Sequence, residues 1–153
     1  MEKSISFKIN GLSKTFFERS DRSLVDVLRE NGYNSVKKSC ETSTCGACTV
    51  LLDGLPVLAC SMYVGRVQGH EITTIEGIYE EAEKIADRIV NQGAEQCGFC
   101  SPGLVLCVYS MKRESSSWTD DKIKRYLAGN LCRCSGYEGQ LRAIKEYLRG
   151  EMA

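Results

Sequence analysis

The sequence lacks several features that would assign a protein to a common functional class. It has one histidine, His70, so a metal site built from several histidines of this chain is excluded. Its 20 Lys and Arg residues balance its 20 Asp and Glu residues, so it has no basic footprint for a nucleic-acid partner. Its most apolar stretch, 50–60, is interrupted by Asp53, Gly54 and Pro56 and is too short to span a bilayer.

An apolar export signal is also lacking, because the first eight residues read MEKSISFK. We therefore expect a cytoplasmic protein with no membrane partner. Disulfides rarely persist in the cytoplasm. The nine cysteines among 153 residues then favour metal binding over a disulfide framework.

The first half of the sequence predicts strands and one helix. Polar and apolar residues alternate before Asn10-Gly11, a strong hairpin signal, and Ser20 or Ser23 caps a helix that Gly32 ends. The second half predicts helices, and the boundary lies near Gly77, giving domains 1–77 and 78–153. The expected elements are strands at 5–9 and 12–17, the helix before Gly32, a hairpin at 49–59, a strand at 71–75, and helices at 79–92, 101–112, from Thr119 to Gly129, and around 141–148.

The first cysteine set consists of Cys40, Cys45 and Cys48, with Cys60 further on. This is the C-x4-C-x2-C…C spacing of plant-type [2Fe–2S] centres. Closely spaced thiolates let one loop wrap around a cluster, and a neighbouring segment supplies the fourth ligand. Gly46 permits a close backbone approach, so that N–H groups could donate to the sulfurs.

The second set consists of Cys97 and Cys100, followed by Cys132 and Cys134. Each pair lies at the edge of a predicted helix. Two helix ends that face each other could present four sulfurs to one cluster, and helix N-terminal dipoles would favour its negative charge.

Spacing alone leaves structural zinc as an alternative for both sets, and more so for the second. A C-x-C pair is unusual for zinc, however. The ninth cysteine, Cys107, lies on the apolar side of its predicted helix, which favours a buried structural thiol.

Five segments of the chain form a recognisable set: CETSTCGACTV at 40–50, Cys60, TIEG at 74–77, QCGFCSPG at 96–103 and GNLCRCSGY at 129–137. Together they resemble the small iron–sulfur subunit of the molybdenum hydroxylase, or xanthine dehydrogenase, family. The resemblance covers nearly the whole chain, and its Gln-Cys-Gly-Phe-Cys and Asn-Leu-Cys-Arg-Cys motifs are specific enough to weigh against zinc.

The resemblance implies an α+β fold, with an N-terminal plant-ferredoxin-like β-grasp followed by an all-α four-helix [2Fe–2S] domain. It implies two [2Fe–2S] clusters, a large subunit that holds a molybdopterin centre, and a medium FAD-binding subunit. Electrons would pass from molybdenum through the second cluster and then the first to FAD. By position, Gln96 and Cys134 match residues that contact the molybdopterin, so Cys134 would be both a cluster ligand and a link to the pterin.

The expected function is therefore one-electron relay within an oxidoreductase complex, with no substrate chemistry on this chain alone. Purine or xanthine is the preferred substrate of the complex by analogy with the family. An aldehyde, an N-heterocycle or carbon monoxide are the alternatives. A free-standing ferredoxin is the rival function, and the zero net charge argues weakly against it.

The chain departs from the family pattern at Ser39 and Ser43, where the cluster loop usually has glycine. If position 43 requires a positive φ, serine adopts it at a cost. These departures affect the loop geometry and the cluster potential, and they leave the ligand set unchanged.

Overall fold

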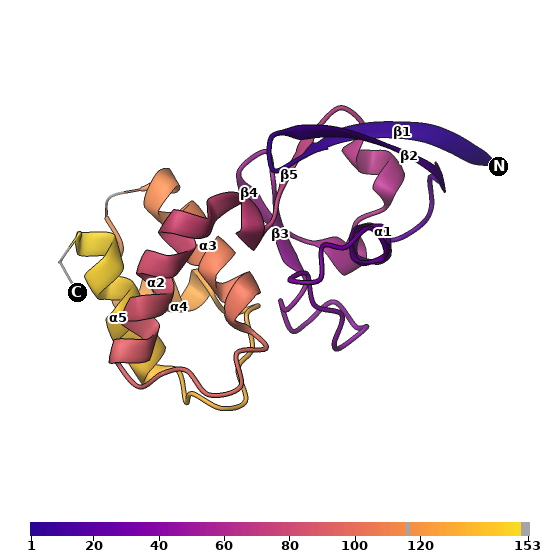
Figure 1. Cartoon of the computed structure of the whole chain (residues 1–153). Helices are drawn as coiled ribbons and strands as arrows, with labels where there is room; N and C mark the ends of the chain where they lie inside the picture. Colours follow the sequence, from indigo (N-terminus) through magenta and orange to yellow (C-terminus); the bar gives the residue numbers. More distant parts are fainter. Residues whose placement is uncertain (116, 151–153) are drawn as a thin grey trace.

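The computed structural model describes residues 1–115 and 117–150. It has a sheet half and a helical half, with the start of β1 and helix α5 at opposite outer ends (Figure 1). The five strands form one sheet in the order β2-β1-β5-β3-β4. Their bounds are β1 Glu2–Ile9, β2 Leu12–Arg19, β3 Thr49–Leu52, β4 Leu55–Leu58 and β5 Glu71–Thr73.

The β1–β5 pair is the one parallel pair of this sheet. The hairpin between β1 and β2 turns at Asn10 and Gly11, which both have positive φ, as a tight two-residue hairpin turn requires. Helix α1 (Leu24–Glu30) is capped by the Ser23 side chain and buries its apolar face. Its residues complete the core of the sheet half, which contains Ile5, Phe7, Ile9, Leu24, Val25, Val27, Leu28, Val36, Cys48, Val50, Ala59, Val64, Val67 and Ile72.

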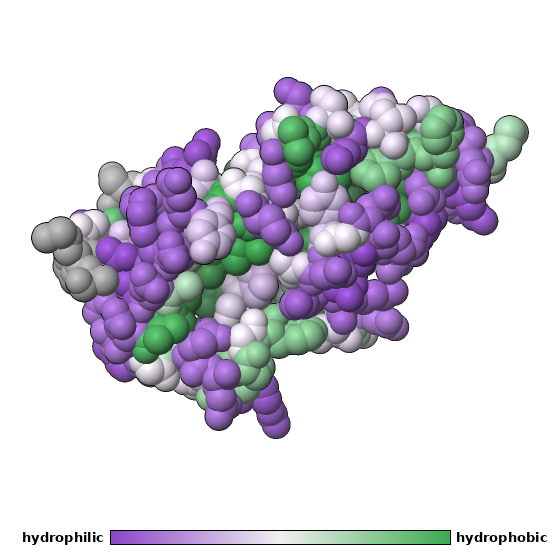
Figure 2. Space-filling model, viewed as in Figure 1, coloured by the Kyte–Doolittle hydropathy of each residue, from purple (hydrophilic) through white to green (hydrophobic). Residues whose placement is uncertain are grey.

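The helical half contains α2 (Tyr79–Asn91), α3 (Ser101–Glu114), α4 (Asp120–Tyr126) and α5 (Glu138–Arg149). Helix α3 has a proline in its first turn, and the Thr119 hydroxyl caps α4. Ile85, Met111 and Ile144 are among the residues that α2, α3 and α5 bury in a second core. Hydrophilic side chains cover much of the visible face, and hydrophobic ones show mainly in the hollows between them (Figure 2).

The two halves are joined through β3. Val50 belongs to the core of the sheet half, whereas its neighbour Leu51 is buried in the core of the helical half. This alternation follows from the strand, because successive side chains point to opposite faces. The Ser110 hydroxyl of α3 also donates to the Gly54 carbonyl at 2.9 Å. The sheet and the helices therefore share packing.

The predicted fold class is confirmed, with a mixed sheet crossed by one helix and followed by four helices. The strand predicted at 71–75 ends at Thr73, because Ile75–Ile78 forms a 3₁₀ turn. The helix that begins at Ser101 continues to Glu114. The polar loop expected at 115–117 includes residue 116, which lies outside the described residues. In the described part of the chain, no helix is long and apolar enough to cross a membrane.

Candidate metal centres

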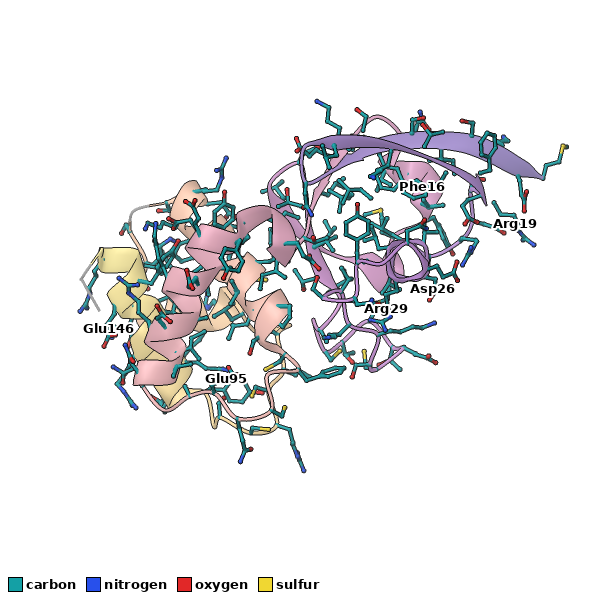
Figure 3. The ribbon with its side chains drawn as sticks, viewed as in Figure 1. Phe16, Arg19, Asp26, Arg29, Glu95 and Glu146 are labelled. Atoms are coloured by element: carbon teal, nitrogen blue, oxygen red, sulfur yellow. The ribbon has the colours of Figure 1, made fainter. Side chains whose placement is uncertain are left out.

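The first cysteine set surrounds a cavity of about 250 Å³ at the side of α1. Arg29 of α1 donates to the carbonyls of Asn34 and Val36, at 3.3 and 2.8 Å, and thus holds the chain that leads into the loop. Figure 3 shows Asp26 and Arg29 on α1 beside this segment. The residues that line the cavity are Ser23, Val25, Asp26, Lys37, Lys38, Ser39, Cys40, Glu41, Cys45, Cys48 and Cys60.

Backbone N–H groups of the loop point at Cys40. Those of Thr44, Thr42 and Cys45, with the Thr42 hydroxyl, lower the pKa of the Cys40 thiol to about 5. The thiolate is the form that ligates a metal. The loop therefore stabilises the ligating form of Cys40 by its own backbone.

Cys48 and Cys60 also line the cavity and lie in contact with each other. Burial raises the pKa of the Cys48 thiol to about 11. Burial would also raise the pKa of Cys60, but hydrogen bonds from Ser43, Cys48 and Ser61 outweigh it and lower that pKa. The sequence gives no signal for a role of Ser61 beyond its position directly after Cys60.

The second cysteine set lies where α3 and α5 begin. Cys97 and Cys100 precede α3, and Cys132 and Cys134 precede α5. The sulfurs of Cys97 and Cys134 are 3.7 Å apart. The pKa of the Cys100 thiol is raised to about 12, mainly by burial and to a smaller extent by a contact with Cys132. The fold thus brings together all four cysteines of this set, as two pairs.

Tyr137 supports the second site in a way that the sequence did not indicate. The Cys132 N–H donates to the Tyr137 hydroxyl oxygen at 3.0 Å. The N–H groups of Cys134 and Ser135 both lie 3.4 Å from the Cys132 sulfur. Tyr137 has a φ of 69°, a costly conformation for an aromatic residue, and the Tyr-Glu sequence gives no local signal for it.

Gln96, Cys97 and Cys134 are exposed, so one side of the second site reaches the molecular surface. The Ser101 hydroxyl donates to the Glu95 carboxylate, whose two oxygens lie 3.0 and 2.9 Å from it, and this contact holds the turn that precedes α3 (Figure 3). The two residues predicted to contact a pterin thus lie on the exposed side of the site.

The two cysteine loops touch each other through their backbones. The Leu131 N–H donates to the Cys45 carbonyl at 2.9 Å. A Cβ at Gly46 would lie 2.3 Å from the Gly129 carbonyl oxygen, and a Cβ at Gly103 would lie 2.4 Å from the Gly46 oxygen. Gly46 was expected to permit approach to the sulfurs. The structure shows that it also permits contact with the second loop.

Cys107 lies apart from both sets. Its thiol is buried in α3, and burial raises its pKa to about 12. The predicted structural thiol is confirmed by this position.

The donor chemistry of the two sites fits [2Fe–2S] clusters. Each site offers four cysteines, and a [2Fe–2S] cluster takes four thiolates, two on each iron. Among the described residues, no three His, Cys, Asp or Glu side chains converge as one metal ion would require. The sulfurs meet in pairs, as in Cys48 with Cys60 and Cys97 with Cys134.

Comparisons with known proteins agree with this chemistry. A family model described as a 2Fe-2S iron-sulfur cluster binding domain matches residues 23–94, and one described as a [2Fe-2S] binding domain matches residues 74–145. The chain is 36% identical to the nicotinate dehydrogenase small FeS subunit of Eubacterium barkeri, over 88% of this chain and 87% of that protein. It is 39% identical to the xanthine dehydrogenase iron-sulfur-binding subunit of Escherichia coli O157:H7, over 88% and 87%.

A solved structure is also similar to this chain in sequence and in fold. Quinoline 2-oxidoreductase from Pseudomonas putida 86 contains a chain that superposes with a TM-score of 0.89 at 34% identity. The match covers 98% of this chain and 94% of that one. The arrangement of sheet, helices and cysteine loops is thus one that occurs in oxidoreductases.

Proposed function

The chain belongs to the family of small [2Fe–2S] iron–sulfur subunits of molybdenum hydroxylases, and on that premise we propose which of its residues perform electron transfer. As a member it binds two [2Fe–2S] clusters and serves an oxidoreductase complex whose large subunit carries the molybdenum centre. Each cluster, when bound, accepts and releases one electron at a time.

The ligands of the first cluster are Cys40, Cys45, Cys48 and Cys60, and those of the second are Cys97, Cys100, Cys132 and Cys134. The grouping of the sulfurs supports this assignment, because each set gathers at one place while Cys107 lies elsewhere. The first cluster belongs to a domain at 1–77, and the second to a domain at 78–153.

One observation carries the proposal, namely the hydrogen bond from the Leu131 N–H to the Cys45 carbonyl. Leu131 is bonded to Cys132, and Cys45 is itself in the first ligand set. A ligand of one site is therefore linked to a ligand of the other by covalent bonds and one hydrogen bond. A short bonded route of this kind suits electron transfer between two clusters. Two independent structural zinc sites would not need such a route, because zinc transfers no electrons.

The exposed side of the second site faces the large subunit. We assign Gln96 and Cys134 to contact with the molybdopterin that the large subunit holds. Their exposure supports this assignment, since a partner-bound group reaches only surface residues. A medium FAD-binding subunit receives the electrons, and the complex works in the cytoplasm.

Xanthine or another purine is the substrate that we propose for the complex. The similarity to a xanthine dehydrogenase iron-sulfur-binding subunit supports it. The nicotinate dehydrogenase and quinoline 2-oxidoreductase relatives favour an N-heterocycle as the second candidate. The large subunit makes the choice between them.

The test is EPR of the dithionite-reduced complex, with iron and sulfide counted on the same sample. We expect two distinct signals and about four iron and four sulfide per chain. Cys45→Ser should remove one signal and Cys100→Ser the other. Each variant should also lose about half of the iron. Cys107→Ala is the control and should keep both signals.

Loss of the same signal in Cys45→Ser and Cys100→Ser would contradict the two ligand sets. Stoichiometric zinc without any signal would overturn electron transfer altogether. Purification of the native chain without molybdenum and without a larger partner would argue against the subunit role.

A further inference from the structure

Ser43 adopts a backbone conformation that suits glycine better than serine. Its φ is 60°, within the left-handed region where a Cβ is strained. The residue is exposed, so burial of its side chain does not offset this strain. What serine adds at this position is a hydroxyl group, and the contacts of that hydroxyl indicate its role.

The Ser43 hydroxyl lies between Ser61 and Cys60. The Ser61 hydroxyl donates to Ser43 Oγ at 2.7 Å, and Ser43 Oγ lies 3.5 Å from Cys60 Sγ. Ser61 Oγ itself is 3.8 Å from that sulfur. Ser43 is therefore the nearer of the two hydroxyls to the sulfur.

The direction of these hydrogen bonds follows from the chemistry of a ligating cysteine. A cysteine that ligates iron is a thiolate, and its sulfur only accepts. Because Ser61 donates to Ser43 Oγ, the Ser43 proton is left to point at Cys60. Ser61 therefore donates to Ser43, and Ser43 donates to the Cys60 sulfur.

This donor differs in kind from those around Cys40. The hydrogen bonds to Cys40 come mainly from backbone N–H groups of its loop, which any sequence with the same loop shape would supply. The donor to Cys60 is instead a side chain, the Ser43 hydroxyl, which a second side chain, Ser61, orients. Substitutions at positions 43 and 61 can therefore change it while the ligands remain in place.

We propose that the hydroxyl pair of Ser61 and Ser43 raises the reduction potential of the first cluster through Cys60 and so favours electron passage from the second cluster to the first. Reduction adds one electron to the first cluster as the second loses one, no bond forms or breaks, and the proton stays on Ser43. A donor on a ligating sulfur stabilises the added negative charge. Ser43 is a positioning residue, since it acts on the cluster through Cys60. The inference rests on the proposed assignment of Cys60 to the first cluster.

The experiment is a redox titration of the assembled complex, followed by the EPR signals of both clusters. Ser43→Ala removes the hydroxyl and keeps the Cβ. At a fixed potential, we expect about a tenfold fall in the ratio of reduced to oxidised first cluster, which corresponds to about 59 mV for one electron. The potential of the second cluster should stay unchanged and serves as an internal reference.

Ser39→Ala is the matched control. Ser39 belongs to the same loop, and within residues 1–115 and 117–150 no hydrogen bond joins its hydroxyl to a cysteine sulfur. It should leave both potentials unchanged. An equal shift in Ser39→Ala and Ser43→Ala would overturn the proposal, as would a shift in Ser43→Gly without one in Ser43→Ala, because the backbone would then set the potential.

Ser61→Ala is the second variant, and it lies outside the strained loop. It should shift the first potential in the same direction by about threefold in the same ratio, because Ser43 loses the donor that orients it. An unchanged potential in Ser61→Ala overturns the proposal even where Ser43→Ala fails to hold its cluster. Failure of the ligand assignment is distinct, since it would appear as a missing signal in the wild-type protein or as a first signal that survives Cys45→Ser.

Discussion

The environments of individual thiols differ widely within one loop. Backbone N–H donors lower the pKa of Cys40 to about 5, whereas burial raises the pKa of Cys48 to about 11. A lowered thiol pKa means that the thiolate is populated at every pH above that value. In the folded, cluster-free chain at neutral pH, Cys40 is therefore a thiolate and Cys48 is a thiol.

This difference predicts an order of reactivity toward iodoacetamide, which attacks the thiolate. In the folded chain without iron, Cys40 should alkylate with a midpoint near pH 5. Cys48, Cys100 and Cys107 should stay slow until the pH exceeds 10. Mass spectrometry of digests taken at each pH measures this. In urea, Cys40, Cys48, Cys100 and Cys107 should all titrate near the ordinary value of about 8.5. A midpoint near about 8.5 for Cys40 in the folded chain would refute the prediction.

At the scale of elements, the contact between the two cysteine loops depends on glycines that lack a Cβ. Gly46 has a φ of +72°, and its Cβ would overlap the Gly129 carbonyl. Gly54 also has a positive φ, +87°, but an added Cβ there meets nothing within 4 Å. The two positions separate backbone strain from steric overlap.

Gly46→Ala should therefore lower the free energy of unfolding by about 2–5 kcal/mol, through strain and overlap together. Gly54→Ala, the control, should lose only the strain, about 1–2 kcal/mol. Urea unfolding of the iron-loaded protein measures both. Equal losses would show that the loops are not in close contact.

The sequence predicted elements best where their ends have local signals. Ser23 and Thr119 cap their helices as expected, and Asn10-Gly11 forms the expected hairpin turn. The predicted strand at 71–75 is too long, because Ile75 begins a 3₁₀ turn and packs, partly buried, against the core of the helical half. The positive φ of Tyr137 and its hydroxyl contact with the Cys132 N–H had no local signal in the sequence.

At the scale of the whole molecule, Leu51 links the two halves. It is a residue of β3 and is 1% exposed within the core of the helical half. Leu55, on the paired strand β4, is 58% exposed. The same substitution at these two sites thus tests whether the halves unfold together.

Leu51→Ala should lower the free energy of unfolding by about 2–5 kcal/mol, because it opens a cavity in a buried core. Leu55→Ala should change it by less than about 0.5 kcal/mol. Far-UV circular dichroism and the visible absorbance of the clusters should report a single shared transition for Leu51→Ala. Two separated transitions would show that the halves are independent units.

The sequence indicates which cysteines form the two candidate sites, but it does not indicate how the two sites are arranged in space. Cysteine spacing and the family motifs indicated the two sets, because neighbouring ligands are constrained along the chain. The Leu131–Cys45 hydrogen bond and the Gly46–Gly129 contact join residues far apart in sequence. No local pattern encodes such contacts, since they arise only when the two halves pack.

The parallel pairing of β1 with β5 also governs the order of assembly. Lys8 pairs with Glu71, so the loop of the first cysteine set lies between two strands that meet only after a long segment of chain has been made. Long-range pairing of this kind is slow to form. During synthesis β1 cannot pair with β5 until β5 has been made, and the second set of four cysteines is complete only with Cys134. The hydrogen bond from the Leu131 N–H to the Cys45 carbonyl also needs both halves of the chain, so the bonded route between the two sites can exist only after most of the chain has been made.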